Sequence, residues 1–136
     1  MELIAKIEEP PSDNADSFGL EIITLNVIGN EIDLKRAYQG HDFVFGLSQG
    51  CLVAIPFHRV ALMQTPSLPD FRDISLLQLL ALQRKPVELE VQINGSIRRS
   101  WLLNVVGNWL RISSRQGVEW VTTTALVMAK VRPVDN

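Results

Sequence analysis

The stretch from Leu79 to Gly95 reads LLALQRKPVELEVQING and contains the signals that decide the fold. Its leucines and the basic pair Arg84-Lys85 are typical of the C-terminal end of a helix, and Pro86 prevents that helix from continuing. Apolar and polar residues then alternate in VELEVQI, which predicts a half-buried strand. Asn94-Gly95 is a strong signal for a hairpin turn. The sequence therefore predicts one helix over about residues 73–85, followed directly by a β-hairpin.

Short strands are predicted on both sides of this stretch. Ile23, Leu25 and Val27 alternate with polar residues and predict a strand that ends at the turn Gly29-Asn30. The other predicted strands are Glu31–Ala37, Asp42–Leu47, Cys51–Ile55 and Val60–Gln64 before the helix, and Ile97–Val105, Trp109–Ser113, Val118–Thr122 and Leu126–Val131 after the hairpin.

The two runs of predicted strands resemble each other at a shift of 65 to 67 residues. The match lies in the turns: Gly29-Asn30 falls opposite Asn94-Gly95, and Gln49-Gly50 opposite Gln116-Gly117. Matched turns at a fixed spacing indicate a duplicated unit. The predicted organisation is an acidic N-terminal strand and loop at 1–19, a first unit at 20–64, a linker at 65–72, and the helix with a second unit at 73–133.

Composition sets the class of protein. The chain has 136 residues, 46% of them apolar and 21% charged, which suits one ordinary domain or two very small ones and excludes a disordered or collagen-like chain. Cys51 is the only cysteine, so no intrachain disulfide and no multi-cysteine zinc site is expected. There is no signal-peptide pattern and no apolar stretch of membrane-spanning length, and we therefore expect a soluble cytoplasmic protein without a membrane partner.

Residues 73–133 resemble one known family. A helix that ends in basic residues and proline, an alternating strand, Asn94-Gly95 and four further short strands form the layout of Hfq and the Sm-like proteins. Residues 20–64 resemble the same barrel without its helix. The resemblance implies a mainly β fold of two tandem small five-stranded Sm-like or SH3-like barrels, connected by one α-helix.

The resemblance weakens where the family's RNA site would lie. The Tyr-Lys-His motif with which Hfq contacts RNA would fall on Val121-Thr122-Thr123, which keeps none of these residues. Ser100 lies nearest to the position of the glycine that the family usually has in its second strand. The fold can therefore be shared while the site is not, because sites are grafted onto folds.

No catalytic residues, cofactor or metal site are predicted. His41 and His58 each stand beside a charged residue, but nothing in the sequence supplies the remaining members of a catalytic triad. Two histidines and one thiol are also a poor ligand set for zinc. A non-enzymatic protein is expected, and an enzyme that uses His41 or His58 is the weakest alternative.

The predicted helix carries more leucine than one barrel needs. Its apolar residues occupy more than half of the circumference, whereas a helix that lies on a single surface needs a stripe about 100° wide. The excess is buried either against the other barrel or against another subunit. If the open strand edges pair as in Hfq, three chains would form a ring of six barrels. The predicted assembly residues are Leu76, Leu79 and Leu80.

Basic residues concentrate late in the chain. The net charge of −2 divides into −7 over residues 1–33 and +5 over residues 84–132. Arginine together with exposed aromatic residues is a common means of holding single-stranded RNA. The alternation around Trp109 and Trp120 instead favours a place in the core. The candidate RNA contacts are Arg98, Arg99, Arg111 and Arg115.

Two functions follow as hypotheses. The first is a non-enzymatic binding or assembly module whose partner is a protein, including a second copy of the chain. The alternative is an RNA-binding protein of the Sm-like kind.

Overall fold

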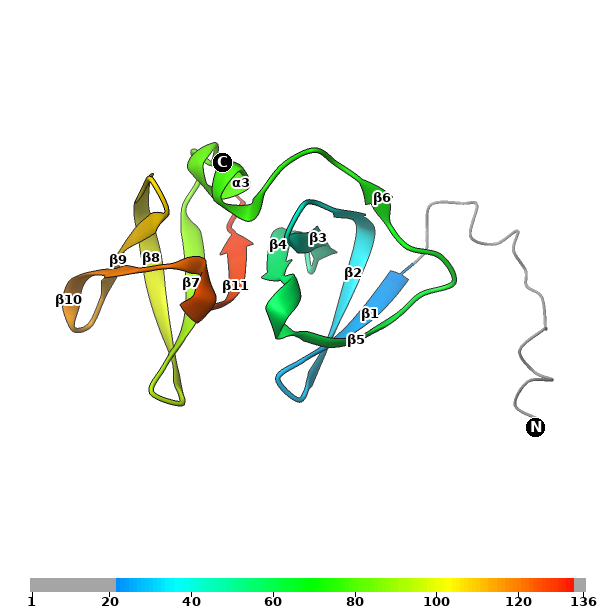
Figure 1. Cartoon of the computed structure of the whole chain (residues 1–136), viewed down its shortest axis with the longest axis horizontal. Coiled ribbons are helices and arrows are strands. Elements are labelled where there is room, and N and C mark those ends of the chain that lie inside the picture. Colours follow the sequence, from blue (N-terminus) through cyan, green and yellow to red (C-terminus); the bar gives the residue numbers. More distant parts are fainter. Residues whose placement is uncertain (1–21, 134–136) are drawn as a thin grey trace.

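The computed structural model describes residues 22–133 and shows a mainly β protein with one short helix, α3 (Leu76–Ala81), as Figure 1 illustrates. The strand and loop expected at 1–19 lie outside the described residues. The strands are β1 (Ile22–Val27), β2 (Asn30–Gln39), β3 (Phe43–Ser48), β4 (Cys51–Pro56), β5 (Val60–Gln64), β6 (Asp70–Phe71), β7 (Val87–Ile93), β8 (Ser96–Val106), β9 (Trp109–Ser114), β10 (Gly117–Val121) and β11 (Leu126–Val131).

The predicted strands are confirmed, most of them within one or two residues. Alternation and turn residues located them because each hairpin depends on a local signal. Asn94 and Gly95, for example, have positive φ in the predicted turn of the β7–β8 hairpin. The β1–β2 hairpin turns at Ile28 and Gly29, one residue before the predicted Gly29-Asn30, and Asn30 is the first residue of β2. The short strand β6, which pairs in parallel with β2, was not predicted.

The strands form one sheet in the order β10-β9-β8-β7-β11-β4-β3-β2-β1-β5. The first half of the chain (residues 22–64) and the second half (residues 87–131) pair their strands in the same order, because the fifth strand of each half lies beside the first. In both halves a 3-10 turn leads into the fifth strand: η1 (Phe57–Arg59) precedes β5, and η2 (Thr123–Ala125) precedes β11.

The sheet is open, and its strand pairing does not form the two separate closed barrels that the sequence predicted. Strand β11 pairs with β7 along one edge and with β4 along the other, so the sheet continues from the second half into the first. The junction between β4 and β11 is antiparallel and joins Ala54 to Ala129, Val53 to Lys130, and Leu52 to Val131. Figure 1 shows these two strands side by side at the centre of the molecule.

Two apolar cores lie on opposite sides of this junction. The first core is built by the first half, and Val127 of β11 joins it. The second core contains the inward residues of the second half, the leucines of α3, and Phe43 and Ala54 from the first half. Strand β11 serves both cores because its side chains alternate: Val127 faces one core and Leu126 faces the other.

Helix α3 is shorter than predicted. Ser75 caps its first turn with a capping box in which Ser75 Oγ accepts from Gln78 N and Gln78 Oε1 accepts from Ser75 N. At the other end the Gln83 N–H bonds only to the Leu80 carbonyl, which is the tighter spacing of a final 3-10 turn. The basic pair Arg84-Lys85 therefore lies in the connection to β7 and not in the helix.

Among residues 22–133, the structure contains no helix with the length and apolar character needed to cross a membrane.

Candidate functional site

Arg98 and Arg99, two of the candidate RNA contacts, lie on opposite faces of β8. The Arg98 side chain is partly buried and donates to Gln116 Oε1 (2.8 Å) and to Glu119 Oε1 (3.2 Å). Arg99 is largely exposed, and its Nε lies 3.6 Å from Glu88 Oε2. The hydrogen bonds of Arg98 are therefore made to residues of the same sheet, whereas the Arg99 side chain is accessible to a ligand.

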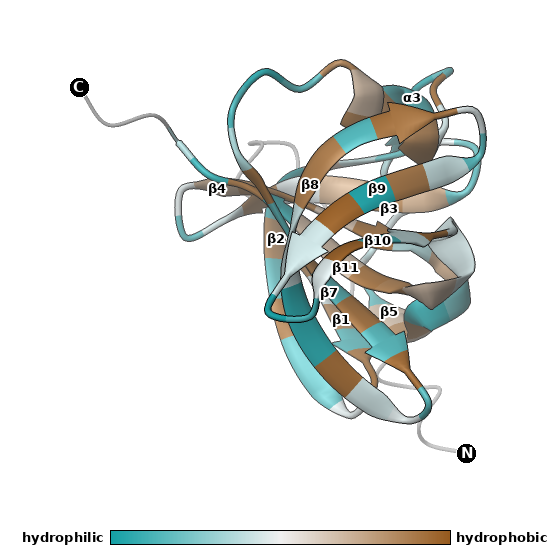
Figure 2. Ribbon diagram, turned by 90° about the vertical axis from the view of Figure 1, so that its left-hand side faces the viewer, coloured by the Kyte–Doolittle hydropathy of each residue, from teal (hydrophilic) through white to brown (hydrophobic). Residues whose placement is uncertain are grey.

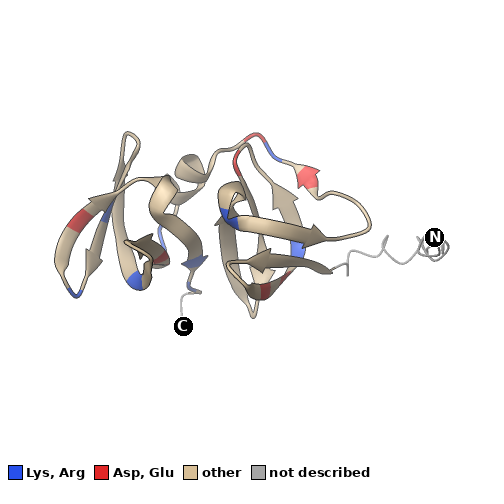
Figure 3. Cartoon of the chain, turned by 60° about the horizontal axis from the view of Figure 1, so that its bottom comes forward, with Lys and Arg blue, Asp and Glu red and all other residues tan. Residues whose placement is uncertain are grey.

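The other two candidate arginines are also apart. Arg111 donates to Asn104 Oδ1 (3.2 Å) on the outer face of β9, and Arg115 is exposed in the β9–β10 turn. Figure 3 shows the Lys and Arg residues of the described chain scattered over several strands and loops. The structure thus does not bring the four arginines together into one phosphate-binding cluster.

The three leucines predicted to form an assembly surface are buried inside the single chain. Leu76, Leu79 and Leu80 belong to the second core, where they pack with Phe43 and with residues of the second half. Their burial agrees with the first of the two explanations for the leucine-rich helix, which is packing between the halves. An interface between chains must therefore use other residues.

His41 pairs with Asp73 and not with its sequence neighbour. Its Nε2 lies 2.6 Å from Asp73 Oδ1, and its ring meets the edge of Phe71. Asp42 instead accepts the backbone N–H of Leu76 (2.9 Å) at the start of α3. The His41 side chain is half exposed and that of Asp73 is 87% exposed, and no hydrogen bond within residues 22–133 joins the pair to a serine, threonine or cysteine. Within residues 22–133 there is also no group of three His, Cys, Asp or Glu side chains that could hold a metal ion.

His58 and Arg59 of the first half form hydrogen bonds with residues of the second half. Arg59 donates to the carbonyls of Leu126 (3.1 Å) and Thr124 (2.9 Å) and to Gln92 Oε1 (2.6 Å). His58 Nε2 lies 3.2 Å from the same Thr124 carbonyl. The two side chains are thus positioned for a structural role at the junction of β4 and β11.

The tryptophans of the second half are exposed, so their predicted place in the core is wrong. Trp109 and Trp120 are each 49% exposed. The inward positions of β9 and β10 are taken by Leu110, Ile112 and Val121, which are buried. Figure 2 views the molecule from the side of β8, β9 and β10. The alternation of tryptophan with Arg111 was the signal that could have located this outer face, because arginine rarely points into a core.

Apart from the two-residue strand β6, which pairs only with β2, the sheet has two free edges among its described strands. Strand β10 pairs only with β9, and strand β5 pairs only with β1. Their outward backbone groups have no strand partner and are available to a further strand.

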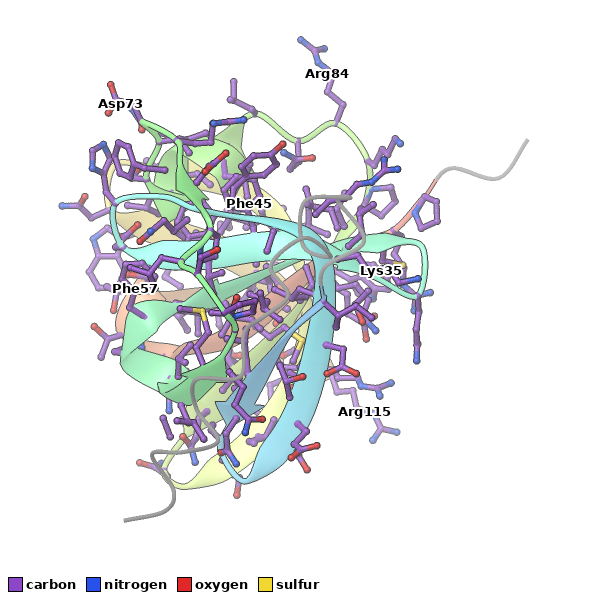
Figure 4. All side chains as sticks on the ribbon, turned by 90° about the vertical axis from the view of Figure 1, so that its right-hand side faces the viewer. Lys35, Phe45, Phe57, Asp73, Arg84 and Arg115 are labelled. Carbon is purple, nitrogen blue, oxygen red and sulfur yellow. The ribbon has the colours of Figure 1, made fainter. Side chains whose placement is uncertain are left out.

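A groove of about 310 Å³ runs beside the connection between α3 and β7. It is lined by Leu47 from the first half and by the basic residues Arg84, Lys85 and Arg132. Arg132 is paired with Glu88 (3.0 Å), and Arg84 points away from the body of the molecule (Figure 4). These cations are therefore paired or solvated, and they do not converge on a common point.

Comparison of the chain with protein-family models, with curated proteins and with solved structures finds no match. The function is therefore inferred from the chain's own geometry.

Proposed function

We propose that this protein is a non-enzymatic assembly module in which two small Sm-like units are joined in one chain, and that copies of the chain associate head to tail. The fourth strand of the second half, β10, pairs with the fifth strand of the first half, β5, of another copy. The partner is thus a second copy of the chain, and the contact is the free edge at each end of the sheet.

The junction inside the chain is the observation that carries this proposal. There, the fourth strand of the first half, β4, pairs with the fifth strand of the second half, β11. The two strands left at the ends of the sheet are the remaining fourth strand and the remaining fifth strand. A second copy can therefore repeat between chains the same kind of junction that the chain already contains.

The sequences of the two free edges support the proposal. Natural edge strands are usually protected by lysine, proline or inward-pointing charges. Strand β5 reads VALMQ and has no charged residue. Strand β10 reads GVEWV, and its one charge, Glu119, points inward opposite Ile112 but is already paired with Arg98 (3.2 Å). Leu62 on β5 and Val118 on β10 are each 56% exposed. Edges of this composition favour pairing with another strand.

A contact between two different edges does not close on itself in a dimer. Head-to-tail contacts form a ring when the rotation between copies closes and a filament when it does not. A ring of three copies would contain six halves, as in the ring expected from the Sm-like resemblance.

The test is the mass of the full chain in solution, measured by light scattering at micromolar concentration. We expect a mass of at least twice the 15.3 kDa of one chain. Leu62→Lys, which adds a charge to the β5 edge, should return the mass to that of one chain. Ile97→Lys is the matched control, because Ile97 is 46% exposed but lies on β8, which has a partner on each side. A wild-type chain that remains monomeric would contradict the proposal.

RNA binding is the second candidate function. Its support is the position of Arg111 directly opposite Trp120, with Trp109 on the same face, because bases can stack on aromatic rings beside a cation. Binding of a labelled single-stranded RNA should then weaken steeply as salt is raised. It should also weaken in Arg111→Ala and in Arg99→Ala, and RNA affinity that both variants leave unchanged would exclude this function.

A further inference from the structure

The outer face of β9 and β10 combines aromatic, aliphatic and basic side chains. Trp120 lies directly opposite Arg111 in the pairing of the two strands, so both side chains are on the same face. Trp109 shares that face because it stands two residues before Arg111, and Val118 shares it because it stands two residues before Trp120. We call these four residues the tryptophan face: Trp109, Arg111, Val118 and Trp120.

The first half has the same face at a shift of 66 residues. The β3–β4 hairpin closes with Ser48 opposite Cys51, and the β9–β10 hairpin closes with Ser114 opposite Gly117. This shift makes Phe43, Phe45, Leu52 and Ala54 the counterparts of Trp109, Arg111, Val118 and Trp120.

The two faces differ in what covers them. Phe43 is 0% exposed and Ala54 is buried, because β11 of the second half and the connecting helix α3 pack on this side of β3 and β4. Phe45 and Leu52 pack against the same core. Among the described residues nothing covers the tryptophan face in the same way, and both of its tryptophans are half exposed.

We infer that the tryptophan face is the docking surface for the first half of a second copy, and this inference rests on the head-to-tail association proposed above. Inside the chain, the face of β3 and β4 is covered by the half whose fifth strand pairs with β4. If β10 pairs with β5 of a second copy, the same geometry brings the first half of that copy over Trp109 and Trp120. The tryptophan face adjoins the free edge itself, because Val118 and Trp120 belong to β10.

The covering surface of the second copy has the chemistry that this contact needs. In the junction inside the chain, Ala129 of β11 lies opposite Ala54, which is the counterpart of Trp120, and the 66-residue shift makes Met63 of β5 the counterpart of Ala129. Met63 is therefore the side chain that this geometry sets beside Trp120, whereas Leu62 projects from the opposite face of β5. Tryptophan, arginine and methionine are among the residue types enriched at the centre of protein–protein interfaces.

The chain offers a control of the same residue type. Trp101 is 44% exposed and lies on β8, in the same half. Its counterpart at the 66-residue shift is Lys35, which is exposed in the first half. The geometry therefore excludes Trp101 from the contact while it includes Trp109.

The experiment measures the dissociation constant between copies by analytical ultracentrifugation for the wild-type full chain, Trp109→Ala and Trp101→Ala. Trp109→Ala should weaken association by about tenfold or more, as truncation of a hot-spot residue does. Trp101→Ala should leave it within about twofold, and circular dichroism should show both variants folded. In the wild type, assembly should also shield tryptophan fluorescence from iodide.

The outcomes separate this inference from the proposed function. If Leu62→Lys dissociates the assembly and Trp109→Ala does not, the chain associates through its edges but the inferred docking surface is wrong. A monomeric wild-type chain overturns both. If Trp109→Ala abolishes binding of single-stranded RNA and leaves the mass unchanged, the face binds nucleic acid and the inference is overturned.

Discussion

The two cores of the molecule are built in different ways. The first core is made by the strands of the first half, with Val127 and Met128 added from β11. The second core takes Phe43 and Ala54 from the first half and the leucines of α3 from the connection between the halves. The second half therefore depends on the rest of the chain for its packing, whereas the first half is nearly complete. The second core therefore also holds the two halves together.

Replacement of Phe43 should give the largest loss of stability among the variants that test how the two cores are built. Phe43 belongs to the first half along the chain and to the second core by packing. Phe43→Ala should lower the free energy of unfolding by about 3–5 kcal/mol, because a fully buried ring leaves a cavity. Urea unfolding followed by circular dichroism measures the change. Phe57→Ala, at an exposed position, should change stability by no more than about 0.5 kcal/mol. Equal effects of the two variants would contradict the shared core.

Replacement of Leu80 tests how much helix α3 contributes to the stability of the second core. Leu80→Ala should cost about 2–5 kcal/mol, since the side chain is buried against both halves. Leu82→Ala is the matched control, because Leu82 is two residues later and exposed. Thermal unfolding of both variants measures the difference. A small loss for Leu80→Ala would mean that the helix contributes little to the second core.

Arg59 tests the polar part of the junction. Arg59→Ala should cost about 1–3 kcal/mol, because it removes charged hydrogen bonds to two carbonyls and to Gln92. Arg59→Lys should recover only part of this loss, because lysine lacks the planar fork that reaches all three acceptors. Urea unfolding of the two variants checks both statements. Full stability of Arg59→Lys would show that the charge alone matters.

The cap of α3 gives the smallest expected effect. Ser75→Ala should cost about 1 kcal/mol, because it leaves the Gln78 N–H without its side-chain acceptor. Ser75→Asp should keep most of the stability, since aspartate is an equally good cap. The comparison is made by thermal unfolding of the two variants. If neither variant differs from the wild type, the helix start is held by the Asp42 contact to Leu76 instead.

Local features of the fold were predictable, and features that join distant segments were not. The VELEVQI alternation and the Asn94-Gly95 turn correctly located β7 and its hairpin, because side-chain period and turn geometry are local properties. Sequence patterns could not tell that β11 has strands on both sides. For the same reason the pairing of His41 with Asp73 was not predicted.

The candidate surfaces, too, were predictable in their local pattern and not in what covers them. The leucine pattern correctly indicated that α3 is buried, but the buried leucines Leu76, Leu79 and Leu80 form a single stripe, and Leu82 is 67% exposed. The pattern also did not say whether the partner of this stripe was in the same chain. The alternation around Trp109 and Trp120 favoured the core, whereas the structure places both tryptophans on the exposed face of their strands. Both answers depend on segments far apart in the sequence, which only the folded chain brings together.

The order of short strands, the turns between them and the single helix were thus fixed by local side-chain period and backbone preference, which residues near in sequence impose on each other. The tertiary structure alone decided that β4 and β11 join the halves, that Phe43 is covered while Trp109 is exposed, and that β5 and β10 remain as edges. The physical reason is that burial and strand partnership depend on which distant segments remove a surface from water. A strand pattern is the same whether its outer face is covered or free.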